Sequence, residues 1–153
     1  MLCHRIVSPR WADTALSGEG ARLYGGRWNS PGRRCIYVAG SRSLAALEML
    51  VHLTGSARGS EWSLLTIEIP DKHVTETASP LPNGWDAMPP GEASQSVGDG
   101  WLEKGSALAM RIPSVVIPGE TNILVNPLAP GFDAVKIIER RTFQLDLRLA
   151  GQS

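Results

Sequence analysis

Residues 23–39 read LYGGRWNSPGRRCIYVA, and this stretch organises the first half of the chain. Its middle, Asn29-Ser30-Pro31-Gly32, consists of residue types that favour a tight turn. The residues on either side form short runs of the β type, so the stretch predicts a β-hairpin. The two expected strands are 23–28 and 35–39.

Arg27 follows a pair of glycines, Gly25 and Gly26, in the first expected strand. Glycine tolerates positive φ angles and a close approach of other backbone, so Arg27 can be held where a ligand also meets the main chain. Its planar guanidinium suits two-point contact with a phosphate or a carboxylate. A surface arginine after a hairpin glycine pair fits the same residues equally well. In the hairpin, Arg27 and Tyr37 would lie on neighbouring strands.

Glu48 is the sharpest candidate for a functional residue. Residues 44–54 predict a helix that begins after Ser43 as its N-cap and stops at Gly55. Glu48 falls inside the apolar stripe of this helix, and no other residue from 43 to 57 is charged. We therefore expect a helix buried nearly all round, with Glu48 facing the core. A buried carboxylate must be paired or line a cleft. Two interpretations stay open: a salt bridge to an arginine, or a carboxylate that faces a ligand.

The rest of the chain predicts an α+β domain with sheets packed on each other and few helices. Residues 70–100 are rich in Pro, Gly, Ser and Thr, which predicts a long loop closed by a short helix at 97–106. In a strand at 62–69, the apolar odd-numbered residues are expected to face inward. Further strands are expected at 2–7, 109–112, 114–117, 122–125, 134–139 and 142–149, and the length fits one domain, 1–153.

Composition and charge exclude several classes of function. The 15 basic and 15 acidic residues cancel, so no overall field favours direct contact with nucleic acid or an anionic membrane. No uncharged run approaches the roughly 18 apolar residues that cross a bilayer, and residues 1–10 do not resemble a signal peptide. We therefore expect a cytoplasmic protein in which Cys3 and Cys35 are reduced.

Common catalytic and metal-binding motifs are also missing from the sequence. The histidines have no carboxylate or cysteine at ligand spacing, so no metal site is predicted. Gly98-Asp99-Gly100 matches neither a Walker loop nor a dinucleotide fingerprint, and Ser114 lacks the surroundings of a hydrolase nucleophile. Asn122 and Asn126 are interpreted as turn or strand-end residues.

Several motifs nevertheless occur in one order along the chain: Arg5 in an initial strand, Gly25-Gly26-Arg27-Trp28-Asn29 with Pro31-Gly32 after it, Tyr37, Ala45 to Glu48, and Ser114 ahead of Glu120-Thr121-Asn122-Ile123-Leu124-Val125-Asn126-Pro127. Together they resemble the RES domain, a family named for an arginine, a glutamate and a serine. The combination is specific, although each piece by itself is common. The similarity covers nearly the whole chain.

The resemblance implies the toxin of a bacterial type II toxin–antitoxin pair, with a fold similar to the ADP-ribosyltransferases of the diphtheria-toxin type. It implies action on NAD⁺ as a substrate, without a prosthetic group. The reaction would be hydrolysis or phosphorolysis of the nicotinamide–ribose bond, or transfer of ADP-ribose to a protein. The expected partner is an antitoxin with an Xre-type helix-turn-helix, which would block the site and make the DNA contacts. A non-enzymatic nucleotide-binding module and a homo-oligomer stay open.

The resemblance also assigns roles by position. It implies that Glu48 serves the ribose and that Tyr37 orients the nicotinamide. Arg5 and Arg27 would hold the pyrophosphate, and Ser114 would position the nicotinamide ribose or its amide. Asn126 is a weaker match to a binding residue, and Leu128-Ala129-Pro130 stands where the family leads us to expect a histidine.

Overall fold

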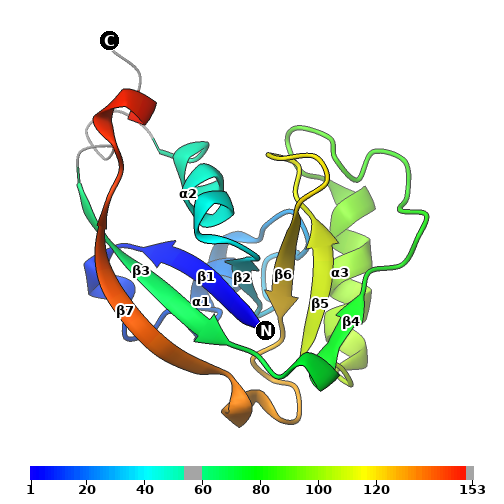
Figure 1. The fold of residues 1–153 in the computed structure, drawn as a ribbon. Coiled ribbons are helices and arrows are strands. Elements are labelled where there is room, and N and C mark those ends of the chain that lie inside the picture. The colour runs from blue at the N-terminus through cyan, green and yellow to red at the C-terminus, as the bar shows by residue number, and fades with distance from the viewer. Residues whose placement is uncertain (54–59, 151–153) are drawn as a thin grey trace.

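Seven strands form one strongly twisted sheet in the computed structural model, which describes residues 1–53 and 60–150 (Figure 1). The strands are β1 (Leu2–Val7), β2 (Ile36–Ala39), β3 (Glu61–Glu68), β4 (Val74–Glu76), β5 (Ala109–Pro113), β6 (Thr121–Val125) and β7 (Lys136–Gln144). They lie in the order β4-β5-β6-β2-β1-β3-β7. Among the described strand pairs, β4 and β5 run parallel and the others antiparallel. The strands thus share one sheet, where sheets packed on each other were expected.

Three α-helices accompany the sheet: α1 (Glu19–Tyr24), α2 (Arg42–Leu50) and α3 (Glu92–Lys104). α2 packs against β1 and β2, with Leu44 and Ala45 buried. α3 lies beside β5, where Val97 and Trp101 join an apolar cluster that includes Leu124 of β6. Short 3-10 turns occupy Pro9–Trp11, Asp71–His73, Phe132–Ala134 and Leu147–Ala150.

α2 and α3 cover the same face of the sheet. On β2, Tyr37 packs in the cluster around α3, whereas Ala39 packs in the cluster around α2. Residues two apart on a strand point to the same face, so this face carries both helices. Val38 points to the opposite face, which carries the largest apolar cluster. The fully buried members of that cluster include Cys3, Ile36, Leu65, Ile67 and Ala109.

The hairpin predicted for residues 23–39 is wrong in its first half. The expected first strand begins with the last two residues of α1 and continues as a loop, and within α1 Glu19 and Arg22 form an ion pair at i,i+3 spacing. This helix ends at Gly25, whose φ of 69° is readily adopted only by glycine. The β-type side chains at its end, Leu23 and Tyr24, remain exposed.

The second half of the predicted hairpin is a strand, but its partners differ from the expected ones. β2 pairs with β1 on one side and with β6 on the other. Arg27 therefore lies in a loop between α1 and β2 and is not on a strand beside Tyr37. The predicted strands at 2–7, 62–69, 109–112 and 122–125 are confirmed as β1, β3, β5 and β6.

β3 is buried on both faces, although the sequence pattern assigned only one face to the core. Leu65, Ile67 and Ile69 are fully buried as expected, but Leu64 and Thr66 are buried too. Thr66 donates a hydrogen bond to Glu139 of β7, with 3.2 Å between the oxygens. β7 is a single strand where two were predicted, at 134–139 and 142–149, and it pairs with β3 along its length through one irregularity in register.

Residues 70–100 contain more regular structure than the predicted loop. β4 pairs with β5, and α3 begins at Glu92 instead of residue 97. Gly98 and Gly100 lower the intrinsic helix propensity of this segment. Packing of Val97 and Trp101 against the sheet stabilises the helix nevertheless.

The strand predicted at 114–117 is also wrong. The backbone N–H groups of Val116 and Ile117 both donate to Ser114 Oγ, at 3.1 Å each. Such local side-chain bonds compete with strand pairing and turn the chain. Residues 114–117 thus form the connection between β5 and β6.

α2 begins earlier than predicted, because Ser41 and not Ser43 is its N-cap. Ser41 Oγ accepts a hydrogen bond from the Leu44 N–H at 3.1 Å. The helix therefore includes Arg42, so Glu48 is not its only charged residue. Residues 46–50 are half-buried, which corrects the expectation of a helix buried nearly all round. The predicted stop at Gly55 lies outside the described residues.

Replacing the observed cap should destabilise the protein, whereas replacing the predicted one should not. Ser41→Ala should lower the free energy of unfolding by about 0.5–2 kcal/mol, because the Leu44 N–H loses its acceptor. Ser43→Ala is the matched control, since Ser43 is exposed and alanine favours helix. Urea denaturation of both variants checks the assignment. Equal losses in the two variants would contradict it.

Candidate active site

Glu48 is held by two neutral donors. Its Oε1 atom accepts hydrogen bonds from Ser114 Oγ at 2.8 Å and from Asn122 Nδ2 at 2.5 Å. None of the ion pairs within residues 1–53 and 60–150 involves Glu48. The salt-bridge interpretation is therefore not supported, and within the described residues no cation pairs with this half-buried side chain.

Ser114 has no freedom in how its hydroxyl points. The residue is buried, and its Oγ accepts the N–H groups of Val116 and Ile117. A hydroxyl has two acceptor sites and one proton. With both acceptor sites used, the proton is left for Glu48, so Ser114 fixes the position of this carboxylate.

Asn122 is the residue that sequence reasoning missed. It was interpreted as a turn or strand-end residue, yet its amide donates directly to Glu48. It lies near the start of β6, two residues before the fully buried Leu124. A side-chain amide on the same strand face as a buried leucine is itself partly buried and needs a hydrogen-bond partner. The sequence alone did not indicate which partner.

Tyr37 reaches the loop after α1 through its hydroxyl. The hydroxyl accepts the Trp28 N–H at 3.0 Å and donates to Asn29 Oδ1 at 2.7 Å. Asn29 is fully buried, and its Nδ2 donates to three backbone carbonyls within residues 21–33. A Cβ atom on Gly26 would lie 2.7 Å from the Tyr37 hydroxyl oxygen, so this position requires glycine. Burial raises the pKa of Tyr37, which therefore stays neutral.

Arg27 is oriented by the segment before α3. Its Nη1 donates to the carbonyls of Trp85 and Ala87, at 2.9 Å each, and its Nη2 contacts Met88 Sδ at 2.9 Å. The rings of Trp28 and Trp85 stack beside it, with 5.8 Å between their centroids. Within the described residues no carboxylate pairs with Arg27, and its Nε–H has no acceptor. The guanidinium is thus fixed in place with an uncompensated charge.

Tyr37 and Glu48 lie on the same face of the sheet. Across the β2–β6 ladder, Tyr37 is opposite Leu124 and Ala39 is opposite Asn122. Tyr37 and the position opposite Asn122 are two residues apart on β2, or roughly 7 Å along the strand. Tyr37 contacts the loop that carries Arg27, and Asn122 contacts Glu48, so β2 and β6 connect the surroundings of these two charged residues.

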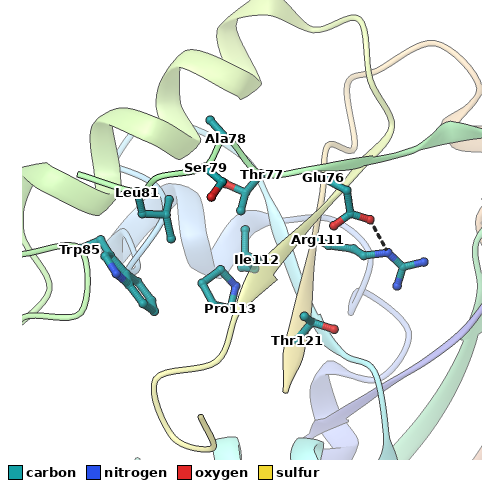
Figure 2. A pocket seen from close by; sticks show the side chains of 10 residues that line it. All are labelled: Glu76, Thr77, Ala78, Ser79, Leu81, Trp85, Arg111, Ile112, Pro113 and Thr121. Atoms are coloured by element: carbon teal, nitrogen blue, oxygen red, sulfur yellow. Dashed lines mark ion pairs between the residues drawn. The ribbon is translucent and has the colours of Figure 1, made fainter. Parts of the chain in front are cut away.

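A pocket of about 350 Å³ lies at the β4–β5 edge and is lined by none of the predicted site residues (Figure 2). Its wall includes Trp85, Pro113 and Thr121, which neighbour the Arg27, Ser114 and Asn122 contacts along the chain or in space. Glu76 and Arg111 form an ion pair on the same wall. The pocket therefore lies beside the contacts of Arg27 and Glu48, but neither of these residues lines it.

The structure does not bring Arg5 to this group. On β1, Ile6 packs with the α2 cluster, whereas Cys3 and Val7 pack in the cluster on the opposite face. Arg5 is two residues from both Cys3 and Val7, so its side chain lies on their face of the sheet and points away from Glu48. Its Nη1 donates to the Ala15 carbonyl at 3.0 Å, and burial lowers its pKa.

Asn126 also lies away from Glu48. It follows β6, four residues beyond Asn122, or roughly 13 Å along the strand direction. Its Oδ1 accepts the Leu128 N–H at 2.9 Å, which is a turn contact. Leu128, which replaces the expected histidine, is exposed.

The family model described as the RES domain matches residues 2–147. The chain belongs to the RES family. A protein named Toxin Res from Photorhabdus laumondii is 36% identical over 151 residues, covering 97% of each chain. The Prs ADP-ribosylating toxin of Sphingobium sp. is 41% identical over 138 residues, covering 88% of this chain and 86% of the relative.

The RES fold is also seen among solved structures. This chain matches one chain of the M. tuberculosis MbcT–MbcA toxin–antitoxin complex with a TM-score of 0.73 and 23% identity, covering 94% of this chain and 84% of that one. The predicted α+β class, with a mixed sheet and few helices, is confirmed. No helix in residues 1–53 or 60–150 is long and apolar enough to cross a membrane. The same residues contain no group of three or more potential metal ligands.

Tyr37 should stay protonated for as long as the protein stays folded. Its raised pKa means that the unfolded tyrosine ionises first, near pH 10, so the free energy of unfolding should fall above about that pH. The chain has two tyrosines, and Tyr24 is 83% exposed. In alkaline absorbance titration of the folded protein, Tyr37→Phe should give the same phenolate signal as the wild type. Loss of that signal in Tyr37→Phe would contradict the burial of its hydroxyl.

Proposed function

We propose that this chain is the toxin of a bacterial type II toxin–antitoxin pair and that it cleaves the nicotinamide–ribose bond of NAD⁺ in the cytoplasm. The observation that carries the proposal is the Glu48 carboxylate, which two neutral donors orient without cancelling its charge. Membership of the RES family and relatives named Toxin Res support it. Depletion of NAD⁺ would then arrest growth.

Cleavage of this bond needs negative charge beside the ribose. As the C1′–N bond breaks, its electron pair leaves with nicotinamide and positive charge develops on the ribose. A fixed carboxylate lowers the energy of that charge, or accepts a hydrogen bond from a ribose hydroxyl. An arginine paired with Glu48 would have cancelled this effect. Ser114 and Asn122 supply the orientation and leave the charge in place.

Arg27 is the proposed grip for the pyrophosphate. Its Nη1 is anchored on two carbonyls, which leaves other N–H groups for phosphate oxygens. The Tyr37 hydroxyl is committed to Trp28 and Asn29, so the ring of Tyr37, and not its hydroxyl, would contact the nicotinamide. Ser114 acts through Glu48. Arg5 and Asn126 are left out of the proposed site.

The proposed partner is an antitoxin with an Xre-type helix-turn-helix that covers the site. The likeness to a chain of a toxin–antitoxin complex supports an antitoxin partner. The zero net charge of this chain agrees with DNA contacts made by the antitoxin.

The second candidate function is transfer of ADP-ribose to a protein. The relative named Prs ADP-ribosylating toxin favours it at 41% identity. Both reactions break the same bond, and they differ in whether water, phosphate or a protein side chain attacks C1′ and then loses its proton. The Glu48 carboxylate, held by Ser114 and Asn122, can serve either reaction.

Removing the charge of Glu48 should abolish nicotinamide release. Glu48→Gln keeps the acceptor for Ser114 and Asn122, so the fold should survive, while the rate should fall at least about a hundredfold. Glu61→Gln, which neutralises an exposed glutamate on β3, is the matched control and should keep the wild-type rate. Chromatography of nicotinamide after mixing with NAD⁺ checks this. Unchanged turnover in Glu48→Gln would contradict the proposed role of Glu48 in bond cleavage.

The same reaction mixture identifies the acceptor. NAD⁺ labelled in its adenylate half is incubated with and without phosphate, and with a bacterial lysate. Free ADP-ribose indicates hydrolysis, and a phosphorylated ADP-ribose that needs phosphate indicates phosphorolysis. Label attached to protein indicates the transferase.

A further inference from the structure

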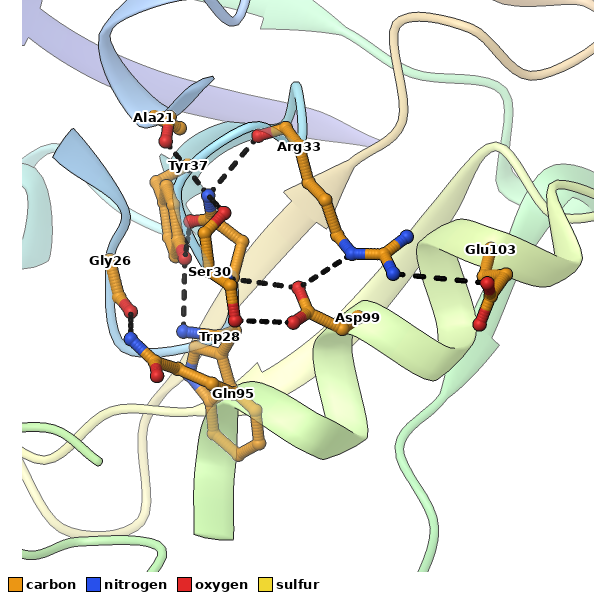
Figure 3. Close-up of polar contacts among 10 residues, drawn as sticks. Ala21, Gly26, Trp28, Ser30, Arg33, Tyr37, Gln95, Asp99 and Glu103 are labelled. Carbon is orange, nitrogen blue, oxygen red and sulfur yellow. Dashed lines mark hydrogen bonds and ion pairs between the residues drawn. The ribbon is translucent and has the colours of Figure 1, made fainter. Parts of the chain in front are cut away.

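One face of α3 is pressed against the loop that carries Arg27. Gln95, Gly98 and Asp99 are spaced three and four residues apart, so they lie on the same side of the helix. Gln95 and Asp99 form hydrogen bonds with Gly26 and Ser30 (Figure 3), and Gly98 lies against Trp28. None of them belongs to a motif that the sequence linked to NAD⁺.

The polar contacts hold both ends of the loop. Gln95 Nε2 donates to the Gly26 carbonyl at 3.1 Å. Asp99 accepts the Ser30 N–H at 3.0 Å on Oδ1 and the Ser30 hydroxyl at 2.6 Å on Oδ2. Arg27 lies between these two clamped positions, so its backbone cannot shift without breaking a contact to α3.

Gly98 lets the helix approach the loop directly. A Cβ atom at this position would lie 1.8 Å from the Trp28 carbonyl oxygen and 2.7 Å from its carbonyl carbon. Glycine is unfavourable inside a helix, so its presence here is explained by this close approach. The Gly98-Asp99-Gly100 stretch, which matches no phosphate-binding motif, thus belongs to the surface of α3 that supports the loop.

Asp99 contacts Ser30 and Arg33 and forms none of the described contacts with Arg27. Its side chain is 17% exposed, and Arg33 Nε lies 3.5 Å from Oδ1. Asp99 therefore fixes the loop through Ser30 while Arg33 partly balances its charge. Arg27 keeps an uncompensated guanidinium for an anion.

We propose that α3 is the positioning element of the substrate grip, with Asp99 and Gln95 holding the loop in the geometry in which Arg27 meets the pyrophosphate. The inference rests on the proposed function. Asp99 is a positioning residue, because it acts through Ser30 and Arg27 and does not touch the reacting atoms. Its loss weakens substrate binding more than it slows the bond cleavage at Glu48.

The test compares KM and kcat for nicotinamide release in variants of α3. Asp99→Ala should raise KM by about threefold to thirtyfold, the range for residues that act on a site through an intermediate, with kcat nearly unchanged. Asp99→Asn should restore KM, because its amide can accept the Ser30 N–H and donate to the Ser30 hydroxyl. Glu92→Ala is the matched control, since it removes an exposed carboxylate at the start of α3 that forms none of the ion pairs within residues 1–53 and 60–150.

A double-mutant cycle separates positioning from general loss of structure. If Asp99 acts through Arg27, adding Asp99→Ala to Arg27→Ala should leave KM where Arg27→Ala alone puts it. Additive effects on KM, or a loss confined to kcat, would overturn the inference. Gln95→Leu removes only the Gly26 contact and should also raise KM, so it replaces Asp99→Ala if that variant fails to fold.

The outcomes distinguish this inference from the proposed function. Wild-type protein that releases no nicotinamide overturns the proposed function. Active wild-type protein with unchanged KM in folded Asp99→Ala or Gln95→Leu overturns only the role of α3.

Discussion

The hydrogen bonds that hold Glu48 are the constraint on which the site depends. Ser114 and Asn122 come from the two ends of the β5–β6 connection and meet the carboxylate on α2. Neutral donors orient an anion without neutralising it, which suits a site where positive charge develops. Because Ser114 Oγ accepts the N–H groups of Val116 and Ile117, its hydroxyl proton is left to donate to Glu48. The irregular 114–117 segment is thus explained by the carboxylate that it serves.

The cation of the site is held by a different and larger set of contacts. Arg27 rests on the carbonyls of Trp85 and Ala87, and its loop is fixed by Tyr37 from the sheet and by Asp99 from α3. β2 and β6 join this half to the Glu48 half through their register. The anion and the cation are therefore held by separate elements of the fold.

The sequence predicted the place of Glu48 on its helix better than the contacts of its carboxylate. The helical stripe correctly placed Glu48 on the inner side of its helix, because that periodicity is local. Its partners are 66 and 74 residues away, and no local pattern encodes such distances. Local propensity also mistook the end of α1 for a strand and missed the first turn of α3, a helix that depends on packing against the sheet. Arg5 matched the family motif by its position in the sequence. In the fold, side chains alternate along β1, so Arg5 lies on the face of the sheet opposite to Glu48.

The central claim is that Glu48 and Arg27 bind the two parts of one NAD⁺ molecule. A crystal structure of Glu48→Gln with NAD⁺ tests it most directly, because slow turnover preserves the dinucleotide. The account predicts the nicotinamide ribose against the side chain at position 48 and the pyrophosphate on Arg27. A dinucleotide bound elsewhere, for example in the pocket at the β4–β5 edge with no contact to either residue, would contradict it.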